Sequence, residues 1–371
     1  MPLLLQNTLT YGAARASRAL AYAFVAWWYG LSSSADLLLF LFAVAMYMVN
    51  VTSRVLGEIM VHRLGAVPGR LVLSLGVLGV VSWLISPLIS FILFGIAASL
   101  LSGVLAGRGT FLIPPAASLL ASCAFVGVAV LFWRSPEPMV LIRAIALGEW
   151  IRLLVLMFFS RRLPQIPFRE LLPALRASSV HFLALSMFAL PPVLARIYAS
   201  WLGEGQVASF SYAAAASGYL ILFFTAGLVV TKSYEWKALP ALRVVEEAFG
   251  MLHRFAPRAL LGSGLLFSVL FAAYYVTEFE LMLVTTFLIP GLVFYYAAAI
   301  GYTALAVLGC LRYVLISASV YVFVSAGLSF AFMEVHGLAG IAIGLTLSQV
   351  IAAVLLMFRV WAEGRILERV S

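Results

Sequence analysis

Apolar residues occur along the sequence in long runs that short polar or charged stretches interrupt. Runs of about 20 residues are typical of helices that cross a bilayer. The pattern predicts twelve spans, and the boundary near Pro87 follows from the helix break that proline imposes. The predicted spans are residues 9–30, 37–53, 71–87, 88–107, 110–132, 138–159, 177–200, 206–230, 259–276, 281–309, 314–333 and 338–358.

Composition narrows the class of protein. Apolar residues make up 64% of the chain, charged residues 10%, and the mean hydropathy is +1.11. Soluble domains have about 45–50% apolar and about 25% charged residues. We therefore predict an all-α polytopic membrane protein, with about twelve transmembrane helices in two pseudo-symmetric lobes of six.

The distribution of basic residues predicts how the chain is oriented. If the N-terminus is cytoplasmic, most of the 23 lysines and arginines fall in inner loops or at inner helix ends, and Arg134 alone falls in an outer loop. Cytoplasmic loops of membrane proteins carry such an excess. We expect both termini to be cytoplasmic in a cell-membrane protein, and we interpret the net charge of +9 as a topology signal with no nucleic-acid partner.

The chain divides into two predicted lobes joined by residues 160–176. The first lobe is residues 1–170, or 1–231 when helices seven and eight are counted with it. The second lobe, residues 171–371, contains helices seven to twelve and the cytoplasmic connection 232–258.

Within that connection, residues 244–253 form an amphipathic stretch that we expect on the membrane surface. Small residues recur at a shift of 173 between the turns that follow spans one and seven. A second echo pairs Leu105-Ala106 with Leu305-Ala306, at a shift of 200. These echoes predict a parallel repeat, with a substrate site between the lobes near the midplane.

The first predicted span contains charges where an embedded helix normally has none. Arg15 and Arg18 precede only twelve uncharged residues, 19–30, so both arginines lie within the span. Arginine at a helix centre costs about 2.5–3.5 kcal/mol on insertion scales, so such residues normally face a bundle interior or a water-filled cavity. Three alternatives remain open: the arginines line a cationic cavity, they extend to the inner interface, or they pair with Glu149.

Glu149 is the one carboxylate within the predicted spans, and Arg152 lies three residues after it. This spacing favours an ion pair over a proton site. Arg54 and Glu58 are one turn apart at an inner helix end, where a helix pair and a substrate contact are both open. Asp36 precedes the second span and is predicted as its N-cap. Cys123 and Cys310 fall in apolar runs and are predicted to be buried.

The chemistry of an enzyme is missing from the sequence. Metal-dependent glycosyl and prenyl transfer generally needs closely spaced aspartates, and this chain has one aspartate in 371 residues. It also lacks a nucleotide-binding glycine loop and a Ser/His/Asp set. We therefore expect no enzyme activity, no cofactor and no metal site.

Four regions combine polar and apolar residues in a distinctive order. The first is a hairpin with Ser-Arg-Ala-Leu-Ala-Tyr-Ala at 17–23, Ala-Asp-Leu-Leu-Leu-Phe at 35–40 and Asn-Val-Thr-Ser-Arg-Val-Leu-Gly-Glu at 50–58. The others are residues 101–114, 146–162 and 196–213, and the last begins Arg-Ile-Tyr-Ala-Ser-Trp-Leu-Gly-Glu-Gly.

In this order the four regions resemble the MurJ lipid II flippases of the MOP superfamily, to which the Wzx flippases and the MATE exporters also belong. The resemblance implies two lobes, alternating access and a monomeric transporter of an amphipathic, anionic lipid-linked sugar. A guanidinium group binds phosphate oxygens bidentately, and a low-dielectric cavity strengthens that attraction. The expected substrate-binding residues are Arg15, Arg18, Asn50, Arg54, Glu58 and Arg196.

The chain departs from the family pattern at identifiable positions. Ala214 and Ala215 stand where the family has an Asp-Arg pair, Ala195 stands where it has an acid, and the predicted spans number twelve where MurJ has fourteen. The alternatives are therefore a MATE-like exporter of small cations and a membrane scaffold that transports nothing. Organic cations need acids in the cavity, and the spans offer Glu149 against five arginines.

Overall fold

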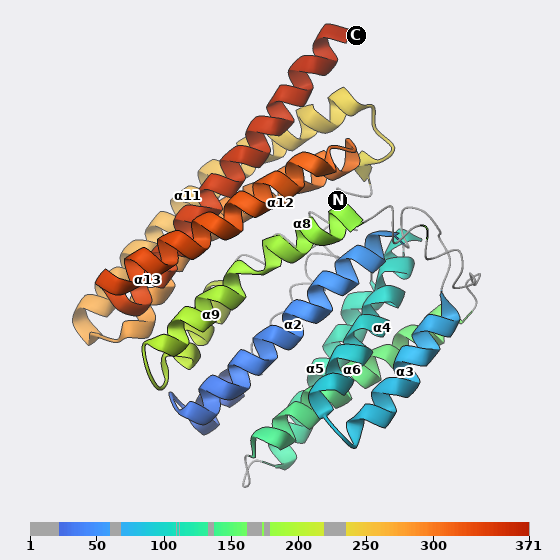
Figure 1. Cartoon of the computed structure of the whole chain (residues 1–371), viewed down its shortest axis with the longest axis vertical. Helices are drawn as coiled ribbons and strands as arrows, with labels where there is room; N and C mark the ends of the chain where they lie inside the picture. The colour runs from blue at the N-terminus through green and yellow to red at the C-terminus, as the bar shows by residue number, and fades with distance from the viewer. Residues whose placement is uncertain are drawn as a thin grey trace. The chain divides into compact units, whose positions relative to one another are not determined.

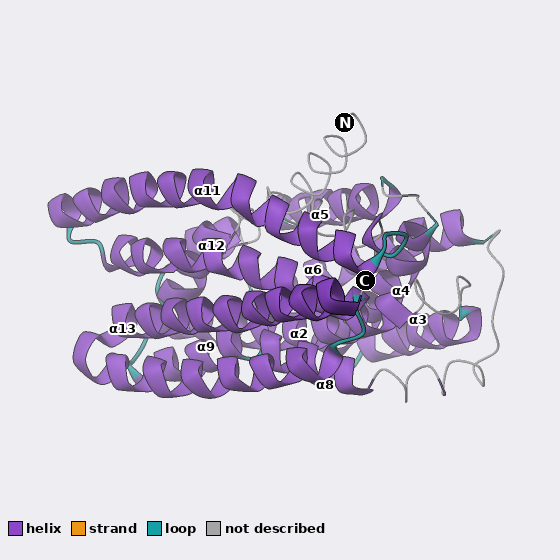
Figure 2. Cartoon of the chain, turned by 90° about the horizontal axis from the view of Figure 1, so that it is seen from above, coloured by secondary structure: helices purple, strands orange, loops and turns teal. Residues whose placement is uncertain are grey.

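In this computed structural model of the chain, residues 22–59, 68–108, 110, 112–132, 137–161, 173, 179–218 and 235–370 are described. Within these residues the chain forms helices joined by short connections, and no β-strand occurs (Figures 1 and 2). The predicted class, an all-α polytopic membrane protein, is confirmed.

The apolar runs form helices long enough for a bilayer. A hydrocarbon core of about 30 Å needs about 20 residues at a rise of about 1.5 Å each. The number of twelve spans stays a prediction, because most of the first span and parts of others lie outside the described residues. Six described stretches meet the length and apolar character of a span: Pro87–Leu105, Ile113–Leu131, Ser179–Trp201, Ala241–Thr277, Glu280–Val307 and Leu311–Glu368.

The chain forms two compact units, of which one contains Met1–Gly30 and Leu37–Leu185. In it, α4 packs against α3 and α6, and α5 packs against α6. Ala45 and Val49 of α2 are buried with Phe91 of α4 and Ala146 of α6. The helices are α2 (Ser33–Ile59), α3 (Gly69–Trp83), α4 (Pro87–Gly107), α5 (Ile113–Leu131), α6 (Pro138–Ser160) and α8 (Ser179–Ala189), whose last residues belong to the other unit.

The other unit contains the turn Leu31–Asp36 and residues Ser186–Ser371. In it, α12 packs extensively against α13, α11 packs against α12, and α9 packs against α13. The hydroxyl of Thr346 in α13 donates a hydrogen bond of 2.6 Å to the carbonyl of Phe287 in α12. The helices are α9 (Pro191–Trp201), residues 206–218, α11 (Ala241–Thr277), α12 (Glu280–Val307) and α13 (Leu311–Val370).

Proline and glycine set three helix breaks. α3 and α4 separate before Pro87, as predicted, and Gly337 (φ 57°, ψ −133°) divides α13 between the last two predicted spans. The seventh predicted span was expected to be one helix, but it is divided into α8 and α9 at Leu190. Pro191 and Pro192 have no backbone N–H to donate to the preceding turn, which accounts for this break.

The predicted surface helix at 244–253 is wrong as a separate element. These residues are the N-terminal part of α11, which continues to Thr277 without interruption (Figure 1). Its apolar face packs on the protein, because a Cβ atom added at Gly364 of α13 would lie 2.9 Å from Val245. The buried residues of this part are Val244, Val245 and Ala248.

Burial of the two cysteines was also predicted wrongly. Cys123 of α5 is exposed and Cys310 is half-buried. In a bilayer the outward face of a helix is as apolar as its packed face, so an apolar run does not distinguish the two faces.

One of the two sequence echoes has a local structural counterpart. The carbonyl of Leu105, near the end of α4, accepts a hydrogen bond from the amide of Thr110 at 3.0 Å. The carbonyl of Leu305, near the end of α12, accepts one from the amide of Cys310 at 2.8 Å. The two helices therefore end with the same bond, while the repeat as a whole stays a prediction.

Candidate functional site

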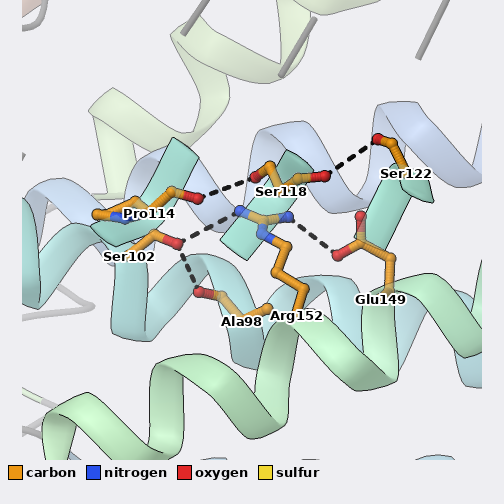
Figure 3. Close-up of polar contacts among 7 residues, drawn as sticks. All are labelled: Ala98, Ser102, Pro114, Ser118, Ser122, Glu149 and Arg152. Carbon is orange, nitrogen blue, oxygen red and sulfur yellow. Dashed lines mark hydrogen bonds and ion pairs between the residues drawn. The ribbon is translucent and has the colours of Figure 1, made fainter. Parts of the chain in front are cut away.

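Glu149 and Arg152 of α6 form a buried ion pair. Their spacing of three places both side chains on one face of the helix, and Nη1 of Arg152 lies 2.9 Å from Oε2 of Glu149. Nη2 of Arg152 donates to the hydroxyl of Ser102 in α4 at 3.3 Å, and that hydroxyl donates to the carbonyl of Ala98 (Figure 3). The pair thus connects α6 with α4.

The pair lies deep in the helix. Glu149 follows the first residue of α6, Pro138, by eleven positions, which is about 16 Å at 1.5 Å per residue, about half of the hydrocarbon thickness. The side chains are 11% and 10% exposed. Because the two charges are opposite, the pair itself has no net charge. Among the described residues, Nε of Arg152 has no hydrogen-bond partner.

A close helix crossing sets the position of this pair. Gly148 precedes Glu149, and a Cβ atom at Gly148 would lie 2.7 Å from the carbonyl oxygen of Ala121 in α5. Because glycine has no side chain, it permits the two backbones to approach this closely. α6 is therefore in close contact with α5 one residue before the carboxylate.

The second unit contains another buried arginine. Arg196 of α9 is 8% exposed. Its Nε donates to the hydroxyl of Ser211 at 3.0 Å, and its Nη1 donates to the carbonyl of Pro192 at 2.8 Å. The ring of Phe210 lies 5.7 Å from the guanidinium carbon, within cation–π range. These three groups are neutral, and they orient the guanidinium.

Asp36 caps a different helix from the one that was predicted. α2 begins at Ser33, and the hydroxyl of Ser32 accepts a bond from the amide of Ala35 at 3.3 Å. The carboxylate of Asp36 accepts bonds from the amides of Gly205 (2.6 Å) and Ala208 (2.7 Å), at the start of helix 206–218. The N-cap prediction for Asp36 was wrong. Helix α2 begins earlier, at Ser33, and its first amides donate to Ser32 and to Glu204 from a distant turn.

This capping is reciprocal. The carboxylate of Glu204, beside helix 206–218, accepts a bond of 2.9 Å from the amide of Ser33 at the start of α2. Each helix N-terminus therefore has an acid from the other turn, where the partial positive charge of the helix favours an anion. Gly205 has φ +81°, and a Cβ atom there would lie 3.0 Å from the carbonyl oxygen of Leu31, so a side chain is disfavoured.

A small apolar hollow lies in the first unit, with a volume of about 20 Å³. Tyr22 and Val25, at the described end of the first predicted span, line it together with residues of α2, α4 and α6. The described end of the first predicted span therefore borders an apolar hollow.

The remaining predicted site residues are described in part or not at all. Arg15 and Arg18 lie outside the described residues. Asn50, Arg54 and Glu58 belong to α2, but their side chains are not among those described. The structure thus brings Glu149 and Arg152 together and places Arg196 in the other unit. Within the described residues, no three His, Cys, Asp or Glu side chains lie close enough to hold a metal ion.

Sequence reasoning missed the groups that hold these arginines. Ser102 and Ser211 are hydroxyls within apolar helices, a pattern that indicates a hydrogen bond but does not identify the partner. Phe210 resembles any apolar residue of a span. Glu204 was recognised only as part of a turn, because its partner Ser33 is 171 residues away.

The sequence matches no protein-family model and no curated protein. Solved structures do resemble it. The lipid II flippase MurJ in an inward closed conformation has a TM-score of 0.74 at 12% identity, over 96% of this chain and 87% of that one. A P26A mutant of a MATE protein has a TM-score of 0.71 at 16% identity, over 99% and 96%.

A third likeness is to a MOP-superfamily transporter from Pyrococcus furiosus, described as having a binding pocket of reverse polarity that suggests a different function. Its TM-score is 0.65 at 16% identity, over 99% of this chain and 96% of that one. At such low identities these likenesses establish the fold, and the fold is that of MurJ and the MATE transporters.

Proposed function

Because the chain has the fold of the MOP-superfamily transporters, we propose that it is a multi-pass transporter that moves an anionic, lipid-linked substrate across a cell membrane by alternating access. The expected substrate is a sugar carried on a phosphate- or pyrophosphate-bearing lipid, and no cofactor is needed. The likeness to a flippase over 96% of the chain supports this proposal, as does the sign of the charges within the spans.

The state of Glu149 is the observation that favours an anionic substrate. The predicted spans contain this one carboxylate and five arginines, and the carboxylate is paired with Arg152 at 2.9 Å. A cationic substrate needs an acid that it can neutralise, and in the described spans of the first unit that acid has a partner. A polar reversal of the binding pocket is described for the Pyrococcus furiosus transporter of this fold.

In this proposal the arginines hold the headgroup while the lobes alternate. Arg15 and Arg18 of the first span contact phosphate oxygens, because a planar guanidinium binds two oxygens of one group at once. Arg196 contributes a third positive charge, held in place by Ser211 and Pro192. Asn50, Arg54 and Glu58 belong to one helix, and we assign them to contacts with the sugar and phosphate.

The test is a reconstituted flipping assay on Arg18→Ala and Arg18→Lys, with the folded yield measured beside it. We expect alanine to abolish flipping with a nearly normal yield, because removing a charge from a span relieves an insertion cost. Lysine should restore flipping only in part, because a point charge does not reproduce the bidentate contact. Arg143→Ala is the matched control, since Arg143 is an exposed arginine of α6.

Each alternative predicts a different result. If Arg18 instead pairs with Glu149, Arg18→Ala lowers the yield and a second change, Glu149→Gln, restores it. Normal flipping by a well-folded Arg18→Ala protein would overturn the assignment of Arg18. Export of a small organic cation without flipping of a phosphate-linked lipid would instead favour the MATE-like function.

A further inference from the structure

The membrane segment of α11 is apolar, and among the described residues it is exposed. In the most apolar stretch of this helix no residue is buried, whereas in the other five candidate spans 39% to 61% of residues are buried. Leu261, Leu265 and Val269 are 69%, 63% and 63% exposed. Their spacing of four places them along one stripe of the helix.

Two arginines, Arg254 and Arg258, lie at the N-terminal end of the stripe formed by Leu261, Leu265 and Val269. Arg258 and Arg254 precede Leu261 by three and seven residues, so they lie on the stripe's face, and both are exposed. Between Arg258 and the last residue of α11, Thr277, there are 19 steps, about 28 Å of helix, close to the thickness of a hydrocarbon core. With Thr277 at one membrane surface, this length places Arg258 at the level of lipid headgroups on the other, and Arg254 one turn beyond it.

These arginines need a counter-charge that the described chain does not supply. Like charges at a spacing of four on a helix repel each other. Nε of Arg254 donates to the carbonyl of Gly250 at 3.1 Å, and within the described residues neither guanidinium forms an ion pair. The neighbouring acids have other partners: Glu246 pairs with Arg243, and Glu247 accepts a bond from Trp236.

The adjacent surface has room for a bound molecule. A shallow, mostly apolar hollow lies along α11 at the level of the two arginines, and Gly250, His253 and Ala256 are among the residues that line it. An anion that binds here therefore has two positive charges and an apolar surface within reach.

We propose that the stripe Arg254, Arg258, Leu261, Leu265 and Val269 binds an anionic glycerophospholipid, with its phosphodiester between the two guanidinium groups and one acyl chain along the apolar residues. A second copy of the chain fits this surface less well. Two copies in one membrane share an orientation, so a two-fold contact along the stripe would place Arg254 and Arg258 against their own counterparts.

The experiment measures lipid preference in reconstituted vesicles of phosphatidylcholine, using spin-labelled phosphatidylglycerol and spin-labelled phosphatidylcholine as probes. For the unaltered chain we expect phosphatidylglycerol to associate more strongly, and 0.5 M salt to weaken that preference. R254Q/R258Q should reduce the preference about fivefold for each arginine removed. R254K/R258K should retain most of it, because the surface attraction depends on charge.

The matched control is R243Q/R365Q, which removes two exposed arginines that have acidic partners, Glu246 and Glu368. Its preference should equal that of the unaltered chain. Equal association of both lipids with the unaltered chain would overturn the proposal, and so would an equal loss in the control variant. Cross-linking of two chains through Leu265→Cys, with Cys123 and Cys310 changed to serine, would show that a second copy covers the stripe.

Discussion

Removing one partner of the Glu149–Arg152 pair should destabilise the protein more than removing both. The side chains are 11% and 10% exposed, so Glu149→Gln leaves a guanidinium in a low-dielectric interior. Stranding one member of a buried pair costs about 3–5 kcal/mol, while replacing both by apolar residues of similar volume is neutral or stabilising. E149Q should therefore lose about 3–5 kcal/mol of unfolding free energy, and E149L/R152M should lose little.

Glu149→Gln and Arg152→Gln should differ in how much unfolding free energy they lose. A stranded carboxylate can take up a proton and become neutral, but a guanidinium stays charged at any accessible pH. Arg152→Gln should therefore cost less than Glu149→Gln. Ser102→Ala should cost about 1 kcal/mol, because its bond to Nη2 of Arg152 is long, 3.3 Å.

The measurement is unfolding of the purified protein in mixed micelles by added sodium dodecyl sulfate, followed by far-ultraviolet circular dichroism. Arg143→Gln is the control, because Arg143 lies on the same helix but is exposed. A Glu149→Gln protein as stable as the unaltered one would refute the reasoning. A double variant that loses the sum of the two single losses would show that the charges are not coupled.

Three further predictions concern residues in the segments that connect the predicted spans. Asp36→Ala should lose about 1–2 kcal/mol of unfolding free energy, because two amides at the start of helix 206–218 lose their acceptor; an unchanged midpoint would contradict this. Burial, and then the hydrogen bond and charge of Glu363, raise the pKa of the Cys310 thiol, so less thiolate is present at pH 8. In a Cys123→Ser background, alkylation of Cys310 should be slow at pH 8 and become faster as the pH increases. The Glu363→Gln change should make alkylation faster at pH 8; slower alkylation in that variant would refute the role of Glu363 in raising the pKa. A cysteine at Arg243 should be labelled only from the cytoplasmic side, and labelling from outside intact cells would reject the predicted topology.

The length and hydropathy of the apolar runs were enough to predict most of the helices. The break before Pro87 and the division of the last two spans at Gly337 follow from residue types that interrupt a helix locally. The break at Leu190 was missed, although Pro191 and Pro192 indicate it, because the apolar run continues through both prolines. The continuous α11 was missed because the basic residues up to Arg258 resemble a loop, while a helix can extend beyond the membrane without any change in its hydrogen bonding.

The candidate site was predictable where its partners are close in sequence. Glu149 and Arg152 are three residues apart, so helix geometry alone places them together. Arg196 was singled out by its charge, but Ser211 and Phe210, which hold it, lie in a helix after a turn and look like ordinary span residues. Charge within an apolar run thus identifies a site residue, and its neutral partners need three-dimensional contacts.

Asp36 shows what a local pattern leaves undetermined. An acid three residues after Ser33 is compatible with helix capping in general, and the sequence predicted that it caps its own helix. In the structure, Ser32 accepts the bond from within α2, and this leaves the Asp36 carboxylate to accept bonds from helix 206–218 while Glu204 accepts one from Ser33. An acidic side chain can cap any helix N-terminus within hydrogen-bond distance, so its partner depends on which turns lie in contact. The recurrence of small residues at a shift of 173 predicts two similar turns, and their mutual capping requires that they also lie in contact.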